Sequence, residues 1–284
     1  MEKSDIQRAI EAARTTAVDL GLRADEGVLI HNSNRIAVRL TPCDVLARVA
    51  PLAHQAGAGF EVELGRRLAE AGCPVEHPEP RVETRVYVRD GFAITLWTYY
   101  ETVMPQDITP TAYAQTLERH HASIRQIDLT VPHFTDRVAK AQRLVSDRAL
   151  TPELDDTGRK LLGNTLRGLR HAILGRGAPE QLLHGEPHPG NLLNTKKGPL
   201  LIDLETCCRG PVEFDISHAP ENVSEHYMAV NQGLLRECQV LVLAMVTAWR
   251  WDRDDQFPNG RYLGIEGINQ IRVALDRYGM DVAD

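Results

Sequence analysis

Three side chains with complementary chemistry lie in one short stretch of the sequence. Glu186 supplies a carboxylate, Asn191 an amide and Asp203 a second carboxylate. A carboxylate can orient a hydroxyl group and accept its proton, while carboxylate and amide oxygens are ligands that Mg²⁺ prefers. Together these residue types are suited to the transfer of a phosphoryl group to a hydroxyl.

The surrounding residues predict a loop followed by a β-hairpin. Gly185 and Pro187 oppose regular structure beside the first acid. Apolar residues at 192–193 and 200–202 predict two strands, and the Lys-Lys-Gly segment at 196–198 predicts the turn between them. We expect this arrangement to bring the two acids and the amide to one end of the hairpin.

A zinc site is the competing interpretation of this stretch. His184 and His188 are four residues apart with Glu186 between them, as in helical zinc-protease motifs. That motif requires a continuous helix, which places both imidazoles on one face. Glycine at 185 and 190 and proline at 187 and 189 oppose a helix, so we expect no zinc site.

Two segments here resemble the aminoglycoside phosphotransferase / choline kinase family, relatives of the protein kinases. The sequence HGEPHPGN at 184–191 is similar to the family's loop HGDxHxxN, and IDLE at 202–205 is similar to its metal-binding phrase IDWE. Gly-Pro at 210–211 and Phe-Asp-Ile at 214–216 resemble the family's following GDP…DL segment. The acid and the amide of the loop also have the spacing of the kinase catalytic loop.

The resemblance implies a role for each residue of the motif. Glu186 is expected to be the catalytic base, and Asn191 and Asp203 are expected to bind Mg²⁺. Three further residues are expected to support the site: His184, His188 and Asp215.

The motif departs from the family pattern at its catalytic acid. Glu186 stands where most members have aspartate, although glutamate variants similar to HGEPHPGN occur in the family. The extra methylene moves the carboxylate by on the order of an ångström, which damages catalysis unless the backbone compensates. A degenerate, inactive site is therefore an alternative, opposed by the presence of both metal-ligand types.

The order of predicted elements is that of an α+β, protein-kinase-like fold with two lobes. Short strands are predicted at 27–30, 35–40, 45–50, 86–88 and 92–97, with a helix marked by Phe60, Leu64 and Leu68. After about residue 101 the periodicity is mostly helical, and the run at 240–249 predicts a buried helix. We predict a nucleotide-binding lobe at 1–101 and a catalytic and acceptor-binding lobe at 102–284, with a connecting strand at 101–110.

The smaller lobe offers candidates for nucleotide binding. Arg48 on the third strand occupies the place of the kinase phosphate-binding lysine, and Glu61 is its expected partner, ahead of Glu63. A solvated arginine at the strand edge is the alternative. By order along the chain, the turn at 31–34 with Ser33 is expected to cover the phosphates. Gly-Ala-Gly at 57–59 predicts a flexible connection.

Residues 96–99, at the end of the last predicted strand and directly after it, correspond in order to the family's interlobe hinge. Trp97 and Tyr99 are therefore candidates for binding the purine of the nucleotide. The alternative is that both aromatic side chains pack in the interior, which is their commoner use.

Composition excludes several classes of protein. The net charge of −7 argues against nonspecific nucleic-acid binding and favours cationic over anionic small-molecule ligands. Five cysteines without CxxC spacing indicate free thiols in a cytoplasmic protein. The first residues lack the apolar core of a signal peptide, and the longest apolar run is too short for a membrane span of about 20 residues.

The sequence therefore predicts a Mg²⁺-dependent phosphotransferase that uses ATP or GTP and phosphorylates a small-molecule hydroxyl. The first expectation for the acceptor is an aminoglycoside or a related antibiotic, which would make the protein an antibiotic-resistance enzyme. A housekeeping metabolite such as choline, a sugar or homoserine is an alternative acceptor. A catalytically silent nucleotide-binding regulator is the alternative from another class. Acidic residues at 221–225 and 252–255 either line a pocket for a cationic acceptor or form a solvated face.

Overall fold

The computed structural model describes residues 3–103, 108–125 and 127–280. Within these ranges the chain forms two compact units, Met1–Asp128 with Gly190–Thr206, and Leu129–Pro189 with Cys207–Asp284. These units differ from the expected division at 101/102, because a helix after that boundary and the hairpin of the motif both pack in the first unit. The expected connecting strand at 101–110 includes residues 104–107, which lie outside the described residues.

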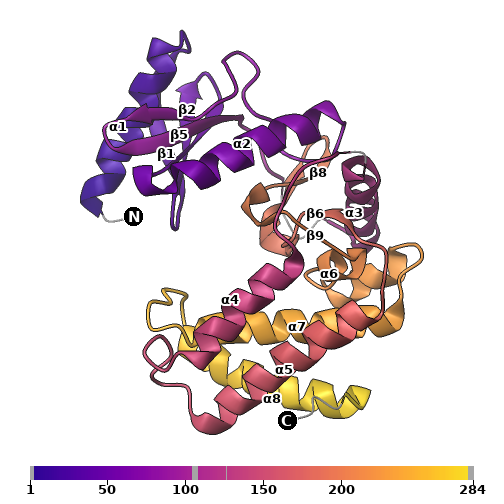
Figure 1. The fold of residues 1–284 in the computed structure, drawn as a ribbon. Coiled ribbons are helices and arrows are strands. Elements are labelled where there is room, and N and C mark those ends of the chain that lie inside the picture. Colours follow the sequence, from indigo (N-terminus) through magenta and orange to yellow (C-terminus); the bar gives the residue numbers. More distant parts are fainter. Residues whose placement is uncertain (1–2, 104–107, 126, 281–284) are drawn as a thin grey trace. The chain divides into compact units, whose positions relative to one another are not determined.

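The first unit is built on a five-stranded antiparallel sheet, as the alternating apolar segments predict (Figure 1). The strand order is β1-β2-β3-β5-β4. The strands are β1 (Ala24–Asn32), β2 (Ile36–Pro42), β3 (Val45–Pro51), β4 (Tyr87–Arg89) and β5 (Phe92–Thr98). Asp90 and Gly91 join the last two with positive φ angles of 51° and 85°, which is the conformation of a tight hairpin turn.

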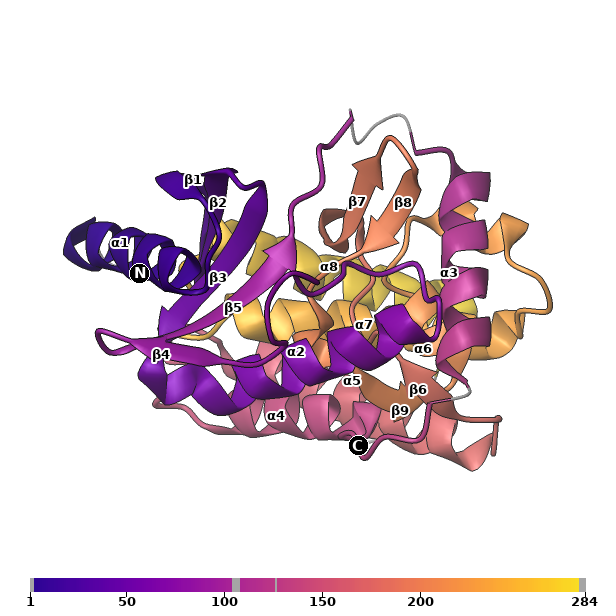
Figure 2. The same cartoon turned by 90° about the horizontal axis from the view of Figure 1, so that it is seen from above.

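Two helices cover opposite faces of this sheet, and Figure 2 shows the strands between them. Val45, Ala47 and Val49 of β3 point to the face where α1 (Lys3–Asp19) contributes a row of buried alanines. The side chains between them, including Arg48, point to the other face, where α2 (Gln55–Glu70) packs. Alternation along β3 therefore directs the predicted phosphate-binding cation toward α2.

Close packing of α2 on the sheet depends on Gly65. A Cβ atom at this position would lie 2.7 Å from the ring of Trp97 in β5, so only glycine allows this approach without a shift. The Gly-Ala-Gly segment at 57–59, expected to be a flexible connection, is instead the first part of α2. Its glycines weaken the helix intrinsically, but burial of Val62, Leu64 and Leu68 stabilises it.

The hairpin of the motif also belongs to the first unit, with strands β7 (Leu192–Thr195) and β8 (Gly198–Leu201) as predicted. The segment at 74–76 runs along β8. The amide of Glu76 donates to the carbonyl of Leu201 at 3.0 Å, and the amide of Leu201 donates to the carbonyl of Pro74 at 2.8 Å. Helix α3 (Pro110–Ile124) packs against β8. The hairpin is thereby held beside the segment that follows α2.

The second unit is mostly helical, with α4 (Phe134–Ser146), α5 (Asp156–Gly175), α7 (Gln232–Arg250) and α8 (Gly260–Tyr278) around one apolar core. Helix α7 contains the apolar run at 240–249 and is buried along much of its length, as predicted. Two short strands, β6 (Gln181–Leu183) and β9 (Cys208–Gly210), pair in antiparallel fashion and precede the loop at 184–189 and α6 (Val212–Ile216), respectively.

All five cysteines are free thiols, as predicted. Burial raises the pKa of Cys73 to about 11, and it also raises the pKa of Cys208 and Cys238. These thiols are therefore packing residues and not nucleophiles. Among the described residues, no helix combines the length and apolar character needed to span a membrane.

Candidate active site

Arg48 is a buried cation on the α2 face of the sheet, not a solvated residue of a strand edge. Its Nη1 donates to Oε1 of Glu61 at 2.6 Å and its Nη2 donates to Oε2 of Glu76 at 2.7 Å. Its guanidinium lies 4.8 Å from the ring centroid of Trp97. Glu61 is thus the partner, as expected, whereas Glu63 pairs with arginines of its own helix.

The pKa shifts in this cluster reflect burial of opposite charges together. Burial by itself would lower the pKa of Arg48, but Glu61 and Glu76 outweigh it and raise that pKa. Burial raises the pKa of Glu76, while Arg48 acts in the opposite direction. Because removing one member leaves an uncompensated buried charge, the three side chains form one structural unit.

Arg35, directly before β2, is a second cation in the same cluster. Its Nη1 pairs with Oε2 of Glu61, and its Nη2 donates to Oε1 of that residue at 3.1 Å. The same Nη2 donates to Oδ1 of Asp203 at 2.6 Å, and Nη1 lies 3.6 Å from Oε2 of Glu205. Arg35 therefore links the glutamate of α2 to the acidic end of the hairpin.

Asp203 has an unusual backbone conformation. Its φ angle is +67°, in the left-handed region that disfavours side chains with a Cβ. Its amide donates to Oε1 of Glu76 at 3.0 Å, which helps to hold this conformation. Strained, well-supported acids of this kind are common where a carboxylate must keep a fixed direction for function.

Asn191 lies beside Asp203 at the open end of the hairpin, as predicted. It ends a 3₁₀ turn, Pro189–Asn191, directly before β7 and is buried. The backbone carbonyl oxygen of Asn191 accepts the amide of Ile202 at 3.0 Å. Asn191 is therefore opposite Ile202, the residue directly before Asp203. Glu205 follows in the 3₁₀ turn Leu204–Thr206.

These groups surround a cavity of about 320 Å³ in the first unit. Ser33 and Asn34, in the turn between β1 and β2, form part of its wall. Gly57 and Ala58 of α2 also line it and leave space because neither has a large side chain. The remaining lining residues are Arg35, Arg48, Ala50, His54, Ala93, Thr95, Asp203 and Glu205. The expected phosphate-covering turn and the expected cation thus face one cavity.

The donor set fits a magnesium–nucleotide complex better than a metal ion alone. Four carboxylates at 61, 76, 203 and 205 and two guanidinium groups at 35 and 48 leave a formal charge of −2 when all are ionised. No group of three or more His, Cys, Asp or Glu residues within the described ranges could hold a metal ion. Mg²⁺ commonly takes only one or two carboxylates from the protein and completes its shell with substrate phosphates and water. Asn191, Asp203 and Glu205 would supply such a partial set.

The catalytic loop predicted in the second unit is held by Asp215. The carboxylate of Asp215 accepts the amide of His184 at 2.9 Å on Oδ2 and the amide of Gly185 at 2.8 Å on Oδ1. Gly185 has a φ angle of +88°, which explains glycine at this turn. The amide of Glu186 donates to Nδ1 of His184 at 3.3 Å, and the amide of His188 donates to the carbonyl of Glu186 at 2.8 Å.

Arg137 of α4 binds the side chain and the backbone of the same loop. Its Nη2 donates to Oε2 of Glu186 at 2.9 Å, and its Nη1 donates to the carbonyl of Gly185 at 2.6 Å. Its guanidinium also lies 5.3 Å from the ring centroid of Trp249. The side chains of Arg137 and Glu186 are 13% and 23% exposed, respectively. The Glu186 carboxylate is therefore fixed by an ion pair while it keeps access to solvent.

His218 lies beneath this loop in the second unit. Burial lowers its pKa to about 3, and Arg137 contributes in the same direction. Its ring meets that of Phe214 edge-on, with centroids 5.3 Å apart. A neutral imidazole is therefore expected here at any physiological pH.

The aromatic candidates for nucleotide binding have structural contacts instead. Trp97 is fully buried within β5, and its Nε1 donates to the hydroxyl of Thr95 at 2.9 Å. Tyr99 follows β5, stacks with Arg39 at 4.2 Å, and donates its amide to the carbonyl of Asp44 at 3.3 Å. The side chain of Trp97 is thus unavailable to a ligand, because alternation along β5 directs it toward Gly65 of α2.

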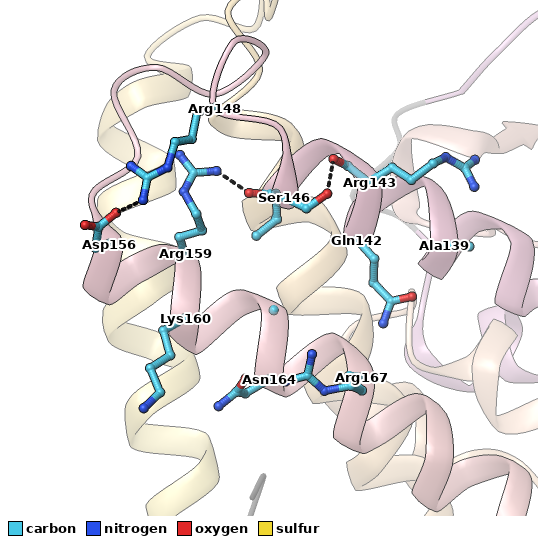
Figure 3. Close-up of a pocket in the computed structure, with 12 residues that line it drawn as sticks. Ala139, Gln142, Arg143, Ser146, Arg148, Asp156, Arg159, Lys160, Asn164 and Arg167 are labelled. Atoms are coloured by element: carbon cyan, nitrogen blue, oxygen red, sulfur yellow. Dashed lines mark hydrogen bonds and ion pairs between the residues drawn. The ribbon is translucent and has the colours of Figure 1, made fainter. Parts of the chain in front are cut away.

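A larger groove of about 740 Å³, between α4 and α5, contains none of these residues (Figure 3). Of its arginines, Arg148, Arg159 and Arg167 are engaged in local structure, the last through Oδ1 of Asn164 at 2.6 Å. Arg148 donates to Oδ1 of Asp156 at 2.6 Å, and Arg159 donates to the hydroxyl of Thr151 at 2.8 Å and to nearby backbone carbonyls. Figure 3 shows Arg143 and Lys160 directed away from each other. The groove therefore presents no convergent binding group.

The acidic residues proposed for a cationic acceptor fit a solvated surface better. Glu221, Glu225 and Asp254 are exposed, and Oδ1 of Asp252 accepts the amide of Asp254 at 3.0 Å. Asp255 pairs with an arginine, 3.2 Å away, at the end of α7.

Sequence reasoning missed three residues of these clusters. The sequence pattern identifies Arg35 only as the first residue of a predicted strand. Glu76 lies outside any helix or strand, and Arg137 is distant from the motif in the sequence. The role of each residue becomes visible only from the ion pair that it forms in the folded chain. In the sequence, each is simply a charged residue among apolar or helical positions.

The chain is similar to small-molecule kinases in sequence. It is 35% identical over 106 residues to methylthioribose kinase from Pectobacterium carotovorum subsp. carotovorum (strain PC1). The matched region is 36% of this chain and 25% of that enzyme, so the chain covers a quarter of the length of this curated relative.

Solved structures show the same fold over nearly the whole chain. The amicoumacin kinase hAmiN, in a complex with AMP-PNP, Ca²⁺ and Ami, has a TM-score of 0.71 at 10% identity and covers 99% of this chain and 98% of its own. An aminoglycoside 2′-phosphotransferase-IIIa variant in a GDP complex has a TM-score of 0.68 at 15% identity and covers 99% and 100%, respectively. The protein-kinase-like α+β fold predicted from the sequence is thereby confirmed.

The family itself is shown by a match that includes both candidate clusters. The model of the APH family, described as "Phosphotransferase enzyme family", matches residues 28–237, which is more than half of the chain. This range extends from the strand that precedes Arg35 to the helix that follows Asp215. The protein is therefore a member of the phosphotransferase enzyme family, as its HGEPHPGN and IDLE segments predict.

Proposed function

We propose that this protein transfers the terminal phosphate of ATP or GTP to a hydroxyl group of a small molecule in a Mg²⁺-dependent reaction. The observation that carries the proposal is a cavity lined by Asp203 and by two arginines, Arg35 and Arg48, that both pair with the buried Glu61 of α2. A cation paired with a helical glutamate, together with a metal-binding acid, is the arrangement that kinases use to hold nucleotide phosphates.

Each cluster has its own part in the reaction. The cavity residues of the first unit bind the nucleotide, with Asn191 and Asp203 as the metal ligands. Bound Mg²⁺ would neutralise charge on the phosphates. Glu186, directed by Arg137, accepts the proton of the acceptor hydroxyl, whose oxygen forms a bond to the terminal phosphorus as the bond to the nucleoside diphosphate breaks. No phosphorylated enzyme is required.

For the acceptor, we propose an aminoglycoside or a related antibiotic first. The fold shared with an aminoglycoside phosphotransferase supports this choice, together with the formal charge of −7, which favours cationic acceptors. A sugar-type metabolite is the second candidate. Its support is the 35% identity to a methylthioribose kinase over 106 residues.

A mass-spectrometric screen for added phosphate tests both candidates. Purified protein is incubated with Mg²⁺ and ATP or GTP and with hydroxylated aminoglycosides, methylthioribose, choline, sugars and homoserine, beside Asp203→Ala as the inactive control. Phosphorylation of one class, absent from the control, supports the function and identifies the acceptor. Magnesium-dependent nucleotide binding without any product would instead favour a silent nucleotide-binding regulator.

A further inference from the structure

Two arginines enter the nucleotide cavity, but their surroundings differ. Arg48 is 8% exposed, and both of its terminal nitrogens are bound by the nearly inaccessible carboxylates of Glu61 and Glu76. Arg35 is 19% exposed and pairs with Glu61, with Asp203, which is 35% exposed, and more distantly with Glu205. Glu61 is 1% exposed, but Asp203 and Glu205 are accessible, so Arg35 is the cation of the cluster with partners that an entering ligand can reach.

The contacts of Arg48 are those of a structural brace. Breaking a buried ion pair leaves a charge in an environment that cannot solvate it, which is strongly unfavourable. A phosphate that drew Arg48 from Glu76 would also disturb the support of Asp203, since Glu76 accepts the amide of that residue at 3.0 Å. Arg48 is therefore poorly suited to change partners during each reaction cycle.

Arg35 forms a hydrogen bond to a carboxylate oxygen of Asp203 that a bound metal would need. Its Nη2 donates to Oδ1 of Asp203 at 2.6 Å, which is a short, charge-assisted hydrogen bond. A guanidinium and Mg²⁺ compete for a carboxylate oxygen, because each requires its lone pairs and repels the other. The contact with Asp203 is partly exposed, so Arg35 can exchange this contact for phosphate oxygens while it keeps Glu61, at a far lower cost than breaking the Arg48 pairs.

We infer that Arg35, rather than Arg48, is the phosphate-binding arginine, and that it releases Asp203 to the metal when a magnesium–nucleotide complex enters the cavity. This inference rests on the proposed nucleotide-dependent function. Arg48 keeps Glu61 and Glu76 in place, while Arg35 moves between two anionic partners. Binding of the metal and of the nucleotide is consequently cooperative, since the phosphates remove the cation that competes with the metal.

The test compares Arg35→Gln with Arg23→Gln, an exposed arginine of the same unit that pairs only locally with Asp25. Manganese binding to the nucleotide-free protein is measured by electron paramagnetic resonance. Calorimetry gives the affinities for Mg–ATP, Mg–GTP and the corresponding nucleosides. We expect Arg35→Gln to bind Mn²⁺ about three- to tenfold more tightly, and to bind the preferred magnesium–nucleotide roughly 10- to 100-fold more weakly. Binding of the nucleoside should stay unchanged, and Arg35→Lys should recover part of the nucleotide affinity.

Opposite signs for the metal and the nucleotide distinguish this role from a structural one. If Arg35→Gln weakens both, or lowers nucleoside affinity equally, the residue only maintains the fold and the inference is wrong. Unchanged magnesium–nucleotide affinity in Arg35→Gln also overturns it. If wild-type protein binds neither magnesium–nucleotide, the proposed function itself fails, which this series separates from failure of the inference alone.

Discussion

Glu76 accepts the backbone amide of Asp203 at 3.0 Å, although the two residues are far apart in the sequence. The same carboxylate binds Arg48, so one buried acid connects the central strand of the sheet with the end of the β7–β8 hairpin. The pairing of the segment at 74–76 with β8 makes this possible. The direction of Asp203 is therefore coupled to the ion pairs beneath the cavity.

Removal of Glu76 should destabilise the protein strongly. In Glu76→Ala, Arg48 keeps one buried partner and the amide of Asp203 loses its acceptor, so the free energy of unfolding should fall by about 3 kcal/mol. Urea unfolding measures this change. Glu70→Ala, which removes an exposed acid of α2, should change stability by less than about 0.5 kcal/mol. Equal losses in both variants would contradict a supporting role for Glu76.

Arg137 should act on the rate of transfer through Glu186. Arg137→Met leaves the carboxylate without its ion pair, and kcat should fall by roughly 10- to 100-fold with little change in KM for the nucleotide. Arg137→Lys should recover part of the activity, because it keeps a cation at this position. A rise in nucleotide KM with unchanged kcat would show that Arg137 does not position the acid.

The extra methylene of Glu186 is part of the same geometry. Glu186→Asp restores the residue type of most family members but shortens the reach toward Arg137, whose Nη2 is now 2.9 Å from the carboxylate. We expect this variant to be less active than the wild type in steady-state assays, in spite of its family-like motif. Higher activity in Glu186→Asp would indicate that the glutamate is a degenerate feature.

The motif was predictable because its signals are local. Glycine and proline exclude a helix around Glu186, and short apolar runs on either side of 196–198 specify the hairpin that brings Asn191 close to Asp203. Arg48 and Glu61 were predictable from the order of strand and helix. In these cases a pattern of a few residues determines both the local structure and the direction of the side chain.

The remaining features depend on tertiary contacts. The helix at 55–70 begins before Gly57 and Gly59 because packing on the sheet outweighs their low helix propensity. Trp97 points inward because its ring packs against Gly65 of α2, a contact between segments distant in the sequence. The partners of Arg35 and Arg137 come from distant segments, and no periodicity or spacing identifies them. Likewise, helix α3 lies beyond the expected boundary but packs against the hairpin.

His218, which is half-buried, should make stability depend on pH. Its pKa is lowered to about 3 by burial first, with Arg137, His188 and His184 acting in the same direction and Asp215 opposing them. Between about pH 6.5 and 3 the unfolded chain binds a proton here that the folded protein does not, so stability falls as the pH decreases. The contribution approaches about 1.4 kcal/mol per pH unit below pH 6.

Urea unfolding at pH 6, 5 and 4 should separate this contribution from that of other groups. His218→Gln should lose stability less steeply than the wild type over this range, whereas His226→Gln, which changes an exposed histidine, should follow the wild type. Identical slopes for His218→Gln and the wild type would mean that the imidazole is protonated in the folded protein or hydrated there.

The most direct measurement follows the terminal phosphate of radiolabelled ATP or GTP in three proteins: wild type, Glu186→Gln and Asp203→Ala. Magnesium-dependent nucleotide binding is measured on the same samples. The wild type should transfer label to the acceptor, Glu186→Gln should bind nucleotide normally but transfer label at least about 100-fold more slowly, and Asp203→Ala should lose the magnesium dependence of binding. Transfer at the wild-type rate by either variant would contradict the assignment of base and metal ligand on which the proposed phosphotransferase mechanism depends.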